Sequence, residues 1–290
     1  MNALASSLIA VAEDVVGSDI GAIVWWKLSG DVSADRLTVA LGGLPGPALP
    51  SPDVALRRGV KALAKRNLLV RSIKGEGWAL VSEDDEGIKG LVYASPADQP
   101  RVKLDIIGRL YFSPHWSCSA EAKVRDAFTY HQEWLDSDDI SPWLIDQATM
   151  CGAVPLRDGG GVYFVPAGDG LRRWKEITAA LTSVSASSIY TVRAMRSDGD
   201  AVRSAIDGLT GQIEEEVAKR TADAISGTLG VRALNNRANE ARDLARKVRQ
   251  YESLLGANLG KLVDSLDQLD TQIAAAVLAA EAQAEEDANG

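Results

Sequence analysis

The C-terminal third of the chain constrains the fold most strongly, because its signals are almost all helical. From Asp200 to Gly290 there is no proline and no tryptophan, and apolar residues recur at spacings of three and four. Such spacings place side chains on one face of a helix. The longer stripe contains Leu244, Val248, Tyr251, Leu255, Leu259, Leu262, Leu266, Leu269 and Ile273.

The pattern predicts long helices in this region, with a kink or hinge near Gly256 and Gly260. An apolar stripe this narrow must be covered by a partner. An earlier stripe, from Val202 to Val217, is shorter, so an αα-hairpin formed by the two would leave part of the longer helix uncovered. That part must meet another chain, meet the body of the protein, or bend. We therefore expect residues 199–290 to form a coiled coil or an αα-hairpin through which the chain self-associates. The residues assigned to self-association are Leu244, Val248, Tyr251, Leu255, Leu262, Leu266, Leu269 and Ile273.

The charge of the chain is unevenly distributed. The 290 residues contain 31 Lys and Arg against 40 Asp and Glu, a net charge of −9, which argues against a protein that coats nucleic acid over its whole surface. Residues 1–82 hold nine basic and seven acidic groups, whereas residues 83–200 hold 12 and 18, and residues 201–290 hold 10 and 15. The acidity therefore lies downstream, and the first segment is weakly basic.

The first segment alternates between helical and extended signals. The predicted helices run from Leu4 to Val16, from Ser33 to Gly42 and from Asp53 to about Asn67, with a strand at Ala22–Leu28 and a hairpin formed by Leu68–Lys74 and Gly77–Ser82. Between Arg57 and Lys74 the chain carries seven basic residues and no acidic one. These are Arg57, Arg58, Lys61, Lys65, Arg66, Arg71 and Lys74.

This order of elements over residues 2–83 resembles a winged helix-turn-helix domain. In that fold the third helix usually reads DNA and the hairpin is the wing, so the resemblance implies that the seven basic residues bind double-stranded DNA. Neutralising phosphates with a basic face is how non-specific DNA affinity arises. Winged helices also bind proteins, and the loop before the third helix is longer than a DNA-reading turn. A protein-binding head is therefore the alternative.

Residues 85–198 are expected to form a mixed α/β domain or a second winged-helix-like unit. The predicted elements are strands at Ile88–Ala94, Val102–Phe112 and Ser188–Ala194, helices at about Ala120–Leu135, Ser141–Met150 and Leu171–Val184, and a hairpin of Ala153–Arg157 with Gly161–Val165. The run PLRDGGGVYFVPAG, taken with the helical tail, is similar to uncharacterised phage- and plasmid-borne proteins, which implies no known activity. The expected fold class is α+β, with domains at 1–84, 85–198 and 199–290.

The chain offers little material for catalysis or metal binding. Its only His and Cys residues are His115, Cys118, His131 and Cys151, and only the first two have the close spacing of a zinc site. A helical His facing inward and a buried Cys explain the others without a metal. There is no phosphate-binding loop, dinucleotide fingerprint or nucleophile elbow. We therefore expect a protein without enzyme activity, catalytic residue, cofactor or metal.

Two functions stay open at this point. The first is a non-enzymatic DNA-associated protein with a winged-helix head and an oligomerising coiled-coil tail. The alternative is a protein–protein scaffold or adaptor that is assembled through the coiled coil without nucleic-acid contact. Two cysteines are too few for a disulfide framework, and no apolar run reaches the roughly 18 residues that a membrane span needs. A cytoplasmic location without membrane contact is expected.

Overall fold

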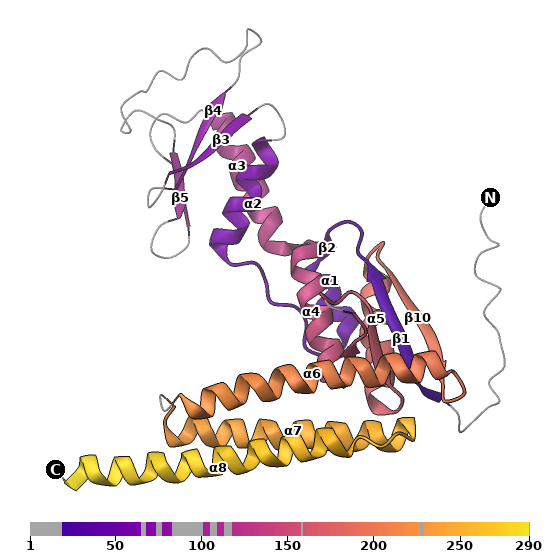
Figure 1. The fold of residues 1–290 in the computed structure, drawn as a ribbon. Helices are drawn as coiled ribbons and strands as arrows, with labels where there is room; N and C mark the ends of the chain where they lie inside the picture. Colours follow the sequence, from indigo (N-terminus) through magenta and orange to yellow (C-terminus); the bar gives the residue numbers. More distant parts are fainter. Residues whose placement is uncertain are drawn as a thin grey trace. The chain divides into compact units, whose positions relative to one another are not determined.

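The computed structural model describes residues 19–64, 68–73, 77–82, 101–104, 109–112, 118–157, 159–226 and 229–289. Over these residues the fold is mixed α+β, with small sheets and a helical C-terminal region (Figure 1). The chain divides into two compact units. The bundle unit comprises Met1–Lys27, Asp146–Glu176 and Ile189–Gly290, and the hairpin unit comprises Leu28–Ile145 and Ile177–Ser188.

The sheet of the bundle unit has the strand order β10-β1-β9-β8. Its strands are β1 (Asp19–Lys27), β8 (Val154–Pro155), β9 (Tyr163–Pro166) and β10 (Ser188–Met195). The strands predicted at Ala22–Leu28 and Ser188–Ala194 are therefore confirmed. β8 and β9 pair antiparallel, which confirms the hairpin predicted around the glycines at 159–161. β1 pairs antiparallel with β9, with Ala22 opposite Val165.

This pairing joins segments that the sequence analysis placed in different domains. β1 belongs to the expected N-terminal domain, and β9 belongs to the expected middle domain. The two compact units therefore do not coincide with the consecutive regions 1–84, 85–198 and 199–290.

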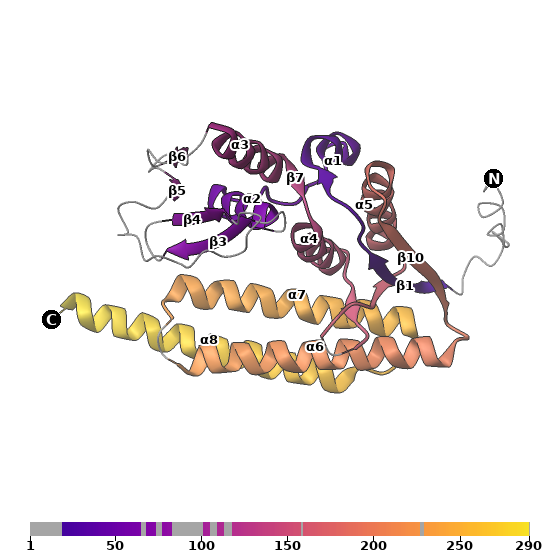
Figure 2. The ribbon, with the colours of Figure 1, turned by 90° about the horizontal axis from the view of Figure 1, so that it is seen from above.

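Three long helices of the bundle unit lie side by side, as Figures 1 and 2 show. They are α6 (Gly199–Ile225), α7 (Val231–Leu255) and α8 (Gly260–Asn289). Gly256 ends α7 with a positive φ of 67°, so the break predicted near Gly256 and Gly260 is confirmed. Among the helices that the structure describes, none is long and apolar enough to cross a membrane.

The helices pack on the sheet as well as on one another. Val154, Phe164 and Ala194 of the sheet belong to the same buried apolar cluster as the inner faces of the three helices. The ring of Phe164 lies 5.9 Å from the ring of Tyr251 on α7, edge to face. Gly208 brings α6 so close to β8 that a Cβ there would overlap the carbonyl oxygen of Pro155. One core therefore serves both layers of this unit.

The hairpin unit contains shorter elements. Its helices are α1 (Ala34–Leu41), α2 (Pro52–Ala64) and α3 (Cys118–Glu133), and its strands are β2 (Val32–Ser33), β3 (Leu68–Ile73), β4 (Gly77–Ser82), β5 (Arg101–Leu104), β6 (Leu110–Phe112) and β7 (Trp134–Leu135). One sheet has the order β3-β4-β5-β6, and β2 pairs with β7. Two further helices, α4 (Ser137–Met150) and α5 (Asp169–Val184), contain residues of both units.

Local signals located several elements correctly. Ser33 caps α1 by accepting a hydrogen bond from the backbone of Arg36, and Gly42 ends the helix with a φ of 58°, as predicted. The hairpin predicted from Leu68 to Ser82 is β3 paired with β4. The helix predicted from Leu4 to Val16 and the strand at Ile88–Ala94 lie outside the described residues.

Two predicted elements are wrong in their extent. The strand expected at Val102–Phe112 is two strands, β5 and β6, with Lys103 opposite Tyr111 in an antiparallel pair. α4 begins at Ser137 rather than at Ser141, and Pro142 lies inside it. The backbone N–H of Asp138 donates to the Asp136 carboxylate at 2.8 Å, so the helix is capped before the Ser-Pro pair is reached.

Candidate nucleic-acid interface

The structure describes four of the seven basic residues assigned to DNA. Arg57, Arg58 and Lys61 lie on α2, and Arg71 lies on β3. The remaining three, Lys65, Arg66 and Lys74, lie outside the described residues. Among the seven, the structure describes the side-chain surroundings of the three residues on α2.

One face of α2 packs against α3 and β5. The residues buried there are Ala55, Leu56, Val60, Val102, Val124 and Phe128. Gly59 sits at the closest approach of the two helices, because a Cβ at this position would lie 3.2 Å from the backbone of Ala127. Arg57 and Lys61 are exposed, one helical turn apart. α2 thus presents two of the three cations to solvent.

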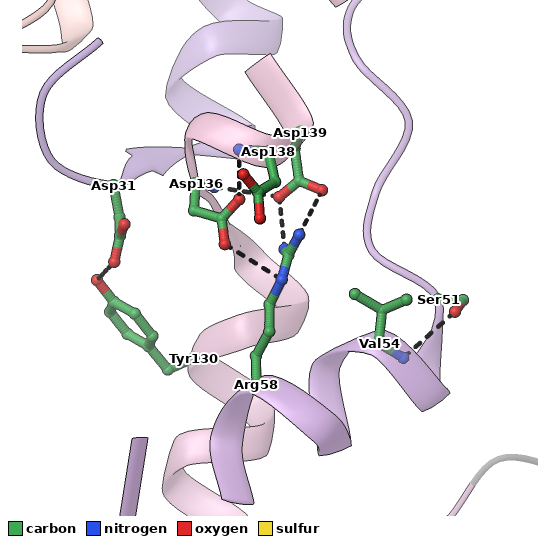
Figure 3. A network of polar contacts seen from close by, with 8 residues as sticks. All are labelled: Asp31, Ser51, Val54, Arg58, Tyr130, Asp136, Asp138 and Asp139. Carbon is green, nitrogen blue, oxygen red and sulfur yellow. Dashed lines mark hydrogen bonds and ion pairs between the residues drawn. The ribbon is translucent and has the colours of Figure 1, made fainter. Parts of the chain in front are cut away.

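Arg58, the third cation, is held by the start of α4 (Figure 3). Its Nη1 and Nη2 donate to the two oxygens of Asp139 at 2.6 and 3.0 Å, and its Nε lies 3.1 Å from Oδ2 of Asp136. The side chains of Arg58 and Asp139 are only 15% and 13% exposed. Two-bond pairs of this kind are among the stronger polar contacts in proteins. Arg58 is therefore occupied by carboxylates, which removes it from the basic face predicted from the sequence.

The same carboxylates form the cap of α4. Asp136 accepts from the backbone N–H of Asp138, and its own N–H donates to Oδ2 of Asp139 at 3.1 Å. This arrangement is a variant of the capping box: Asp139 accepts from the N-cap amide in place of the more usual Glu or Gln, and the Asp136 carboxylate accepts from the second rather than the third helical amide. Arg58 contacts both members of the box, so it fixes α2 to the first turn of α4.

The electrostatics of this network indicate a structural role. The hydrogen bond to Asp139 raises the pKa of Arg58, which keeps the guanidinium charged. Burial raises the pKa of Asp136, although the nearby Arg58 opposes that shift. Burial also lowers the pKa of His131 on α3. For both Asp136 and His131, loss of solvent outweighs the neighbouring charges.

Tyr130 makes a neighbouring contact in the same unit (Figure 3). Its hydroxyl donates to Oδ2 of Asp31 at 2.8 Å. Its ring also stacks on Trp134, with centroids 5.4 Å apart. Burial and the bond to Asp31 raise the pKa of Tyr130 to about 12. The phenol therefore stays protonated near neutral pH and continues to donate this bond.

The residues assigned to self-association are covered within the chain itself. The buried members are Val248, Tyr251, Leu255, Leu262, Leu266, Leu269 and Ile273, and Leu244 is half-buried. All eight belong to or pack against the apolar cluster that α6 and the sheet complete. The body of the same chain thus covers the stripe, which is one of the partners that the pattern left open. Self-association stays a prediction without support from these residues.

Sequence reasoning missed a polar role for two residues of α7. Lys247 Nζ donates to the carbonyl oxygen of Ala153 at 2.9 Å and to Oε1 of Gln212 at 2.8 Å. The hydroxyl of Tyr251 donates to the carbonyl oxygen of Gly152 at 2.8 Å. Burial lowers the pKa of Lys247 to about 8. The two side chains thus fasten α7 to the turn that follows α4.

A set of exposed arginines on α7 was also missed. These residues are Arg232, Arg242, Arg246 and Arg249. Their spacings of ten, four and three place them within about a third of the helix circumference, as 3.6 residues complete one turn. A search for periodic charge, in addition to periodic apolar residues, would have found them.

The structure describes three of the four His and Cys residues. His131 lies on α3, Cys118 is the first residue of α3, and His115 lies outside the described residues. Cys151 is a buried free thiol after α4, and burial raises its pKa. Within the part of the chain that the structure describes, no three His, Cys, Asp or Glu residues are grouped to hold a metal ion.

Comparisons with known proteins identify a family without an assigned activity. The model of a family of unknown function, DUF6744, matches residues 19–285. No curated protein and no solved structure matches the chain.

Proposed function

We propose that this chain, which belongs to the family of unknown function DUF6744, is a non-enzymatic DNA-associated protein that contacts the duplex with α2 and the hairpin β3–β4. The observation that carries the proposal is the position of Arg57 and Lys61. Both are exposed one turn apart on α2, whose opposite face is buried against α3. Cations placed in this way neutralise phosphates without leaving the helix.

The proposal keeps only part of the winged-helix resemblance. α2 acts as the helix laid against the duplex, and β3–β4 acts as the wing. β1 is left out, because it pairs with β9 in the bundle unit. Arg58 has a positioning role here: its pair with Asp139 holds α2 so that Arg57 and Lys61 face outward.

Salt-dependent binding tests this proposal. The full chain is titrated into a labelled DNA duplex at several salt concentrations, with fluorescence anisotropy as the readout. Each phosphate contact contributes about 0.9 to the slope of log affinity against log salt, so the double variant Arg57→Gln, Lys61→Gln should reduce that slope by about 1.8. The matched control is Arg172→Gln, Arg203→Gln, which removes two exposed arginines elsewhere. Equal slopes for the two double variants would overturn the proposal.

A protein scaffold is the second candidate, and the position of β10 at the edge of its sheet, among the described strands, favours it. β10 is the last strand of its sheet, with Tyr190 43% and Val192 50% exposed. Tyr190 stacks on Trp25 with centroids 5.2 Å apart. An unprotected edge strand with exposed apolar side chains is a template for a further strand.

The sequence of β10 fits a second copy of itself. If two copies pair antiparallel about Thr191, each Tyr190 lies opposite Val192 of the other copy, and the two Thr191 residues face each other. Aromatic with β-branched pairs and Thr–Thr pairs both stabilise antiparallel strands. Sedimentation equilibrium of the full chain and of Val192→Lys tests this candidate. A dimer that Val192→Lys dissociates supports it, and a monomer at every concentration overturns it.

A further inference from the structure

The exposed face of α7 is a continuous polar ridge, which we call the α7 ridge. It is formed by Arg232, Asn235, Asn239, Arg242, Arg246 and Arg249, all of them exposed. At 1.5 Å per residue the ridge is about 26 Å long. It contains guanidinium and amide groups without an apolar side chain among them.

α7 is the basic helix of an otherwise acidic bundle. It carries six basic and three acidic residues, whereas α6 carries three and six, and α8 carries one and seven. A polyanion is therefore repelled by the charge of α6 and α8 and attracted by that of α7. The charge distribution therefore favours binding of a polyanion to the α7 face of the bundle.

The ridge arginines differ from the other cations of α7 in their availability. Lys247 and Arg237 face inward, because Lys247 bonds Ala153 and Arg237 pairs with Asp223 of α6. On the ridge, Arg246 pairs with Asp243 at 3.2 Å and Arg242 pairs with Asp270 at 3.8 Å. Exposed pairs of this kind are weak and exchange readily for a stronger anion.

The remaining two arginines extend the ridge at both ends. Between residues 229 and 289, apart from side chains beyond 283, the structure gives no ion-pair partner to Arg232 or Arg249. Within that part of the chain, the ridge therefore offers cations without an ion-pair partner at its ends and weakly paired cations in its middle.

The chemistry of the ridge favours phosphate over a protein partner. A protein interface of this length has an apolar core that is depleted of charged residues. The ridge has no such apolar core. Guanidinium groups bind phosphate oxygens with two parallel hydrogen bonds. Asparagine side chains also donate to phosphates along a nucleic-acid backbone. We infer that the α7 ridge binds the phosphate backbone of a nucleic-acid duplex. This inference rests on the proposed function and adds a second contact surface to it.

The test compares three sets of variants in the full chain, with circular dichroism to establish that each is folded. The ridge variant is Arg232→Gln, Arg246→Gln, Arg249→Gln, and the α2 variant is Arg57→Gln, Lys61→Gln. The control is Arg36→Gln, Arg172→Gln, Arg203→Gln, which removes the same charge from exposed positions on three other helices. Anisotropy titrations use a labelled DNA duplex and an RNA duplex of the same length.

The ridge variant should lower the salt slope by about 2.7, which corresponds to a loss on the order of 10²-fold in affinity at 0.1 M salt. The control should bind as the unchanged chain does. A loss of affinity for either duplex supports phosphate binding. The duplex that the unchanged chain binds more tightly shows whether the phosphates are those of DNA or of RNA.

Three results would contradict the inference. If the ridge variant binds like the control while the α2 variant loses affinity, the ridge inference fails and the proposed function stands. If the unchanged chain binds neither duplex at low salt, both fail. If polyglutamate of equal charge binds the ridge as tightly as the duplex does, the ridge is a site for acidic protein and the inference fails.

Discussion

Arg58 on α2 and Asp139 on α4 form a two-bond ion pair, although 81 residues separate them in the sequence. Arg58 stands next to Arg57 in the same basic run, yet the two side chains have different surroundings. Arg57 is exposed, while Arg58 is largely buried against two carboxylates. One of these neighbours is therefore available to a partner, and the other holds the fold together.

The two arginines should respond differently to truncation. Arg58→Ala leaves Asp136 and Asp139 ionised and poorly solvated, so we expect the hairpin unit to lose about 2–4 kcal/mol of unfolding free energy. Arg57→Ala, the matched control, should change it by less than about 0.5 kcal/mol. Urea unfolding followed by hydrogen exchange of the α3 and α4 amides measures both. Similar losses for the two variants would show that the ion pair contributes little.

Two glycines of α6 provide a second contrast. A Cβ at Gly208 would overlap the carbonyl oxygen of Pro155, whereas nothing lies within 4 Å of a Cβ at Gly211. Gly208→Ala must push α6 away from β8, and we expect it to destabilise the bundle unit by about 1–3 kcal/mol. Gly211→Ala should stabilise it by up to about 1 kcal/mol, because alanine favours the helix. Thermal unfolding of the two variants compares them directly. Shifts of the melting temperature in the same direction would contradict the close contact between Gly208 and Pro155.

Signals that act over a few residues were readable in the sequence, and pairings over long distances were not. Ser33 and Gly42 delimit α1 through contacts with their own helix, so their residue types suffice. β1 is recognisable as a strand, but its β-branched and aromatic residues do not specify β9 as its neighbour. The periodicity of α7 showed that the stripe needs a partner without showing that the same chain supplies it.

The candidate interface was likewise predictable from local signals but not from contacts between distant segments. Seven basic residues in a run predict a positive surface only if none of them meets a carboxylate in the fold. Arg58 meets Asp136 and Asp139, and the start of α4 at Ser137 is what brings those carboxylates there. The α7 ridge differs: its arginines follow helical spacing and are readable in the sequence, but the apolar stripe of the same helix gives no sign of them.

The apolar stripe itself can be tested by truncation. Leu266 is 1% exposed in the core of the bundle, and Leu278 on the same helix is 67% exposed. Leu266→Ala should reduce the unfolding free energy by about 2–5 kcal/mol through loss of buried surface and the cavity left behind, without changing the molecular mass in solution. Leu278→Ala should change neither quantity. A mass that falls by half in Leu266→Ala alone would show that the stripe joins two chains after all.

Lys247 should make the stability of the bundle unit depend on pH in a direction opposite to that of most lysines. Its pKa is lowered from 10.5 to about 8 by burial, so between these values the unfolded chain binds a proton that the folded chain has released. Unfolding free energy should therefore rise from pH 8 towards pH 10, by up to about 3 kcal/mol. Burial raises the pKa of Tyr251, so above about pH 10 ionisation of the unfolded phenol lowers stability again.

Lys247→Met should remove the rise in unfolding free energy. The control Lys219→Met, which replaces an exposed lysine on α6, should retain it. Urea unfolding at a series of pH values measures the curve, and a flat curve between pH 8 and 10 in the unchanged chain would show that Lys247 is not buried as a cation.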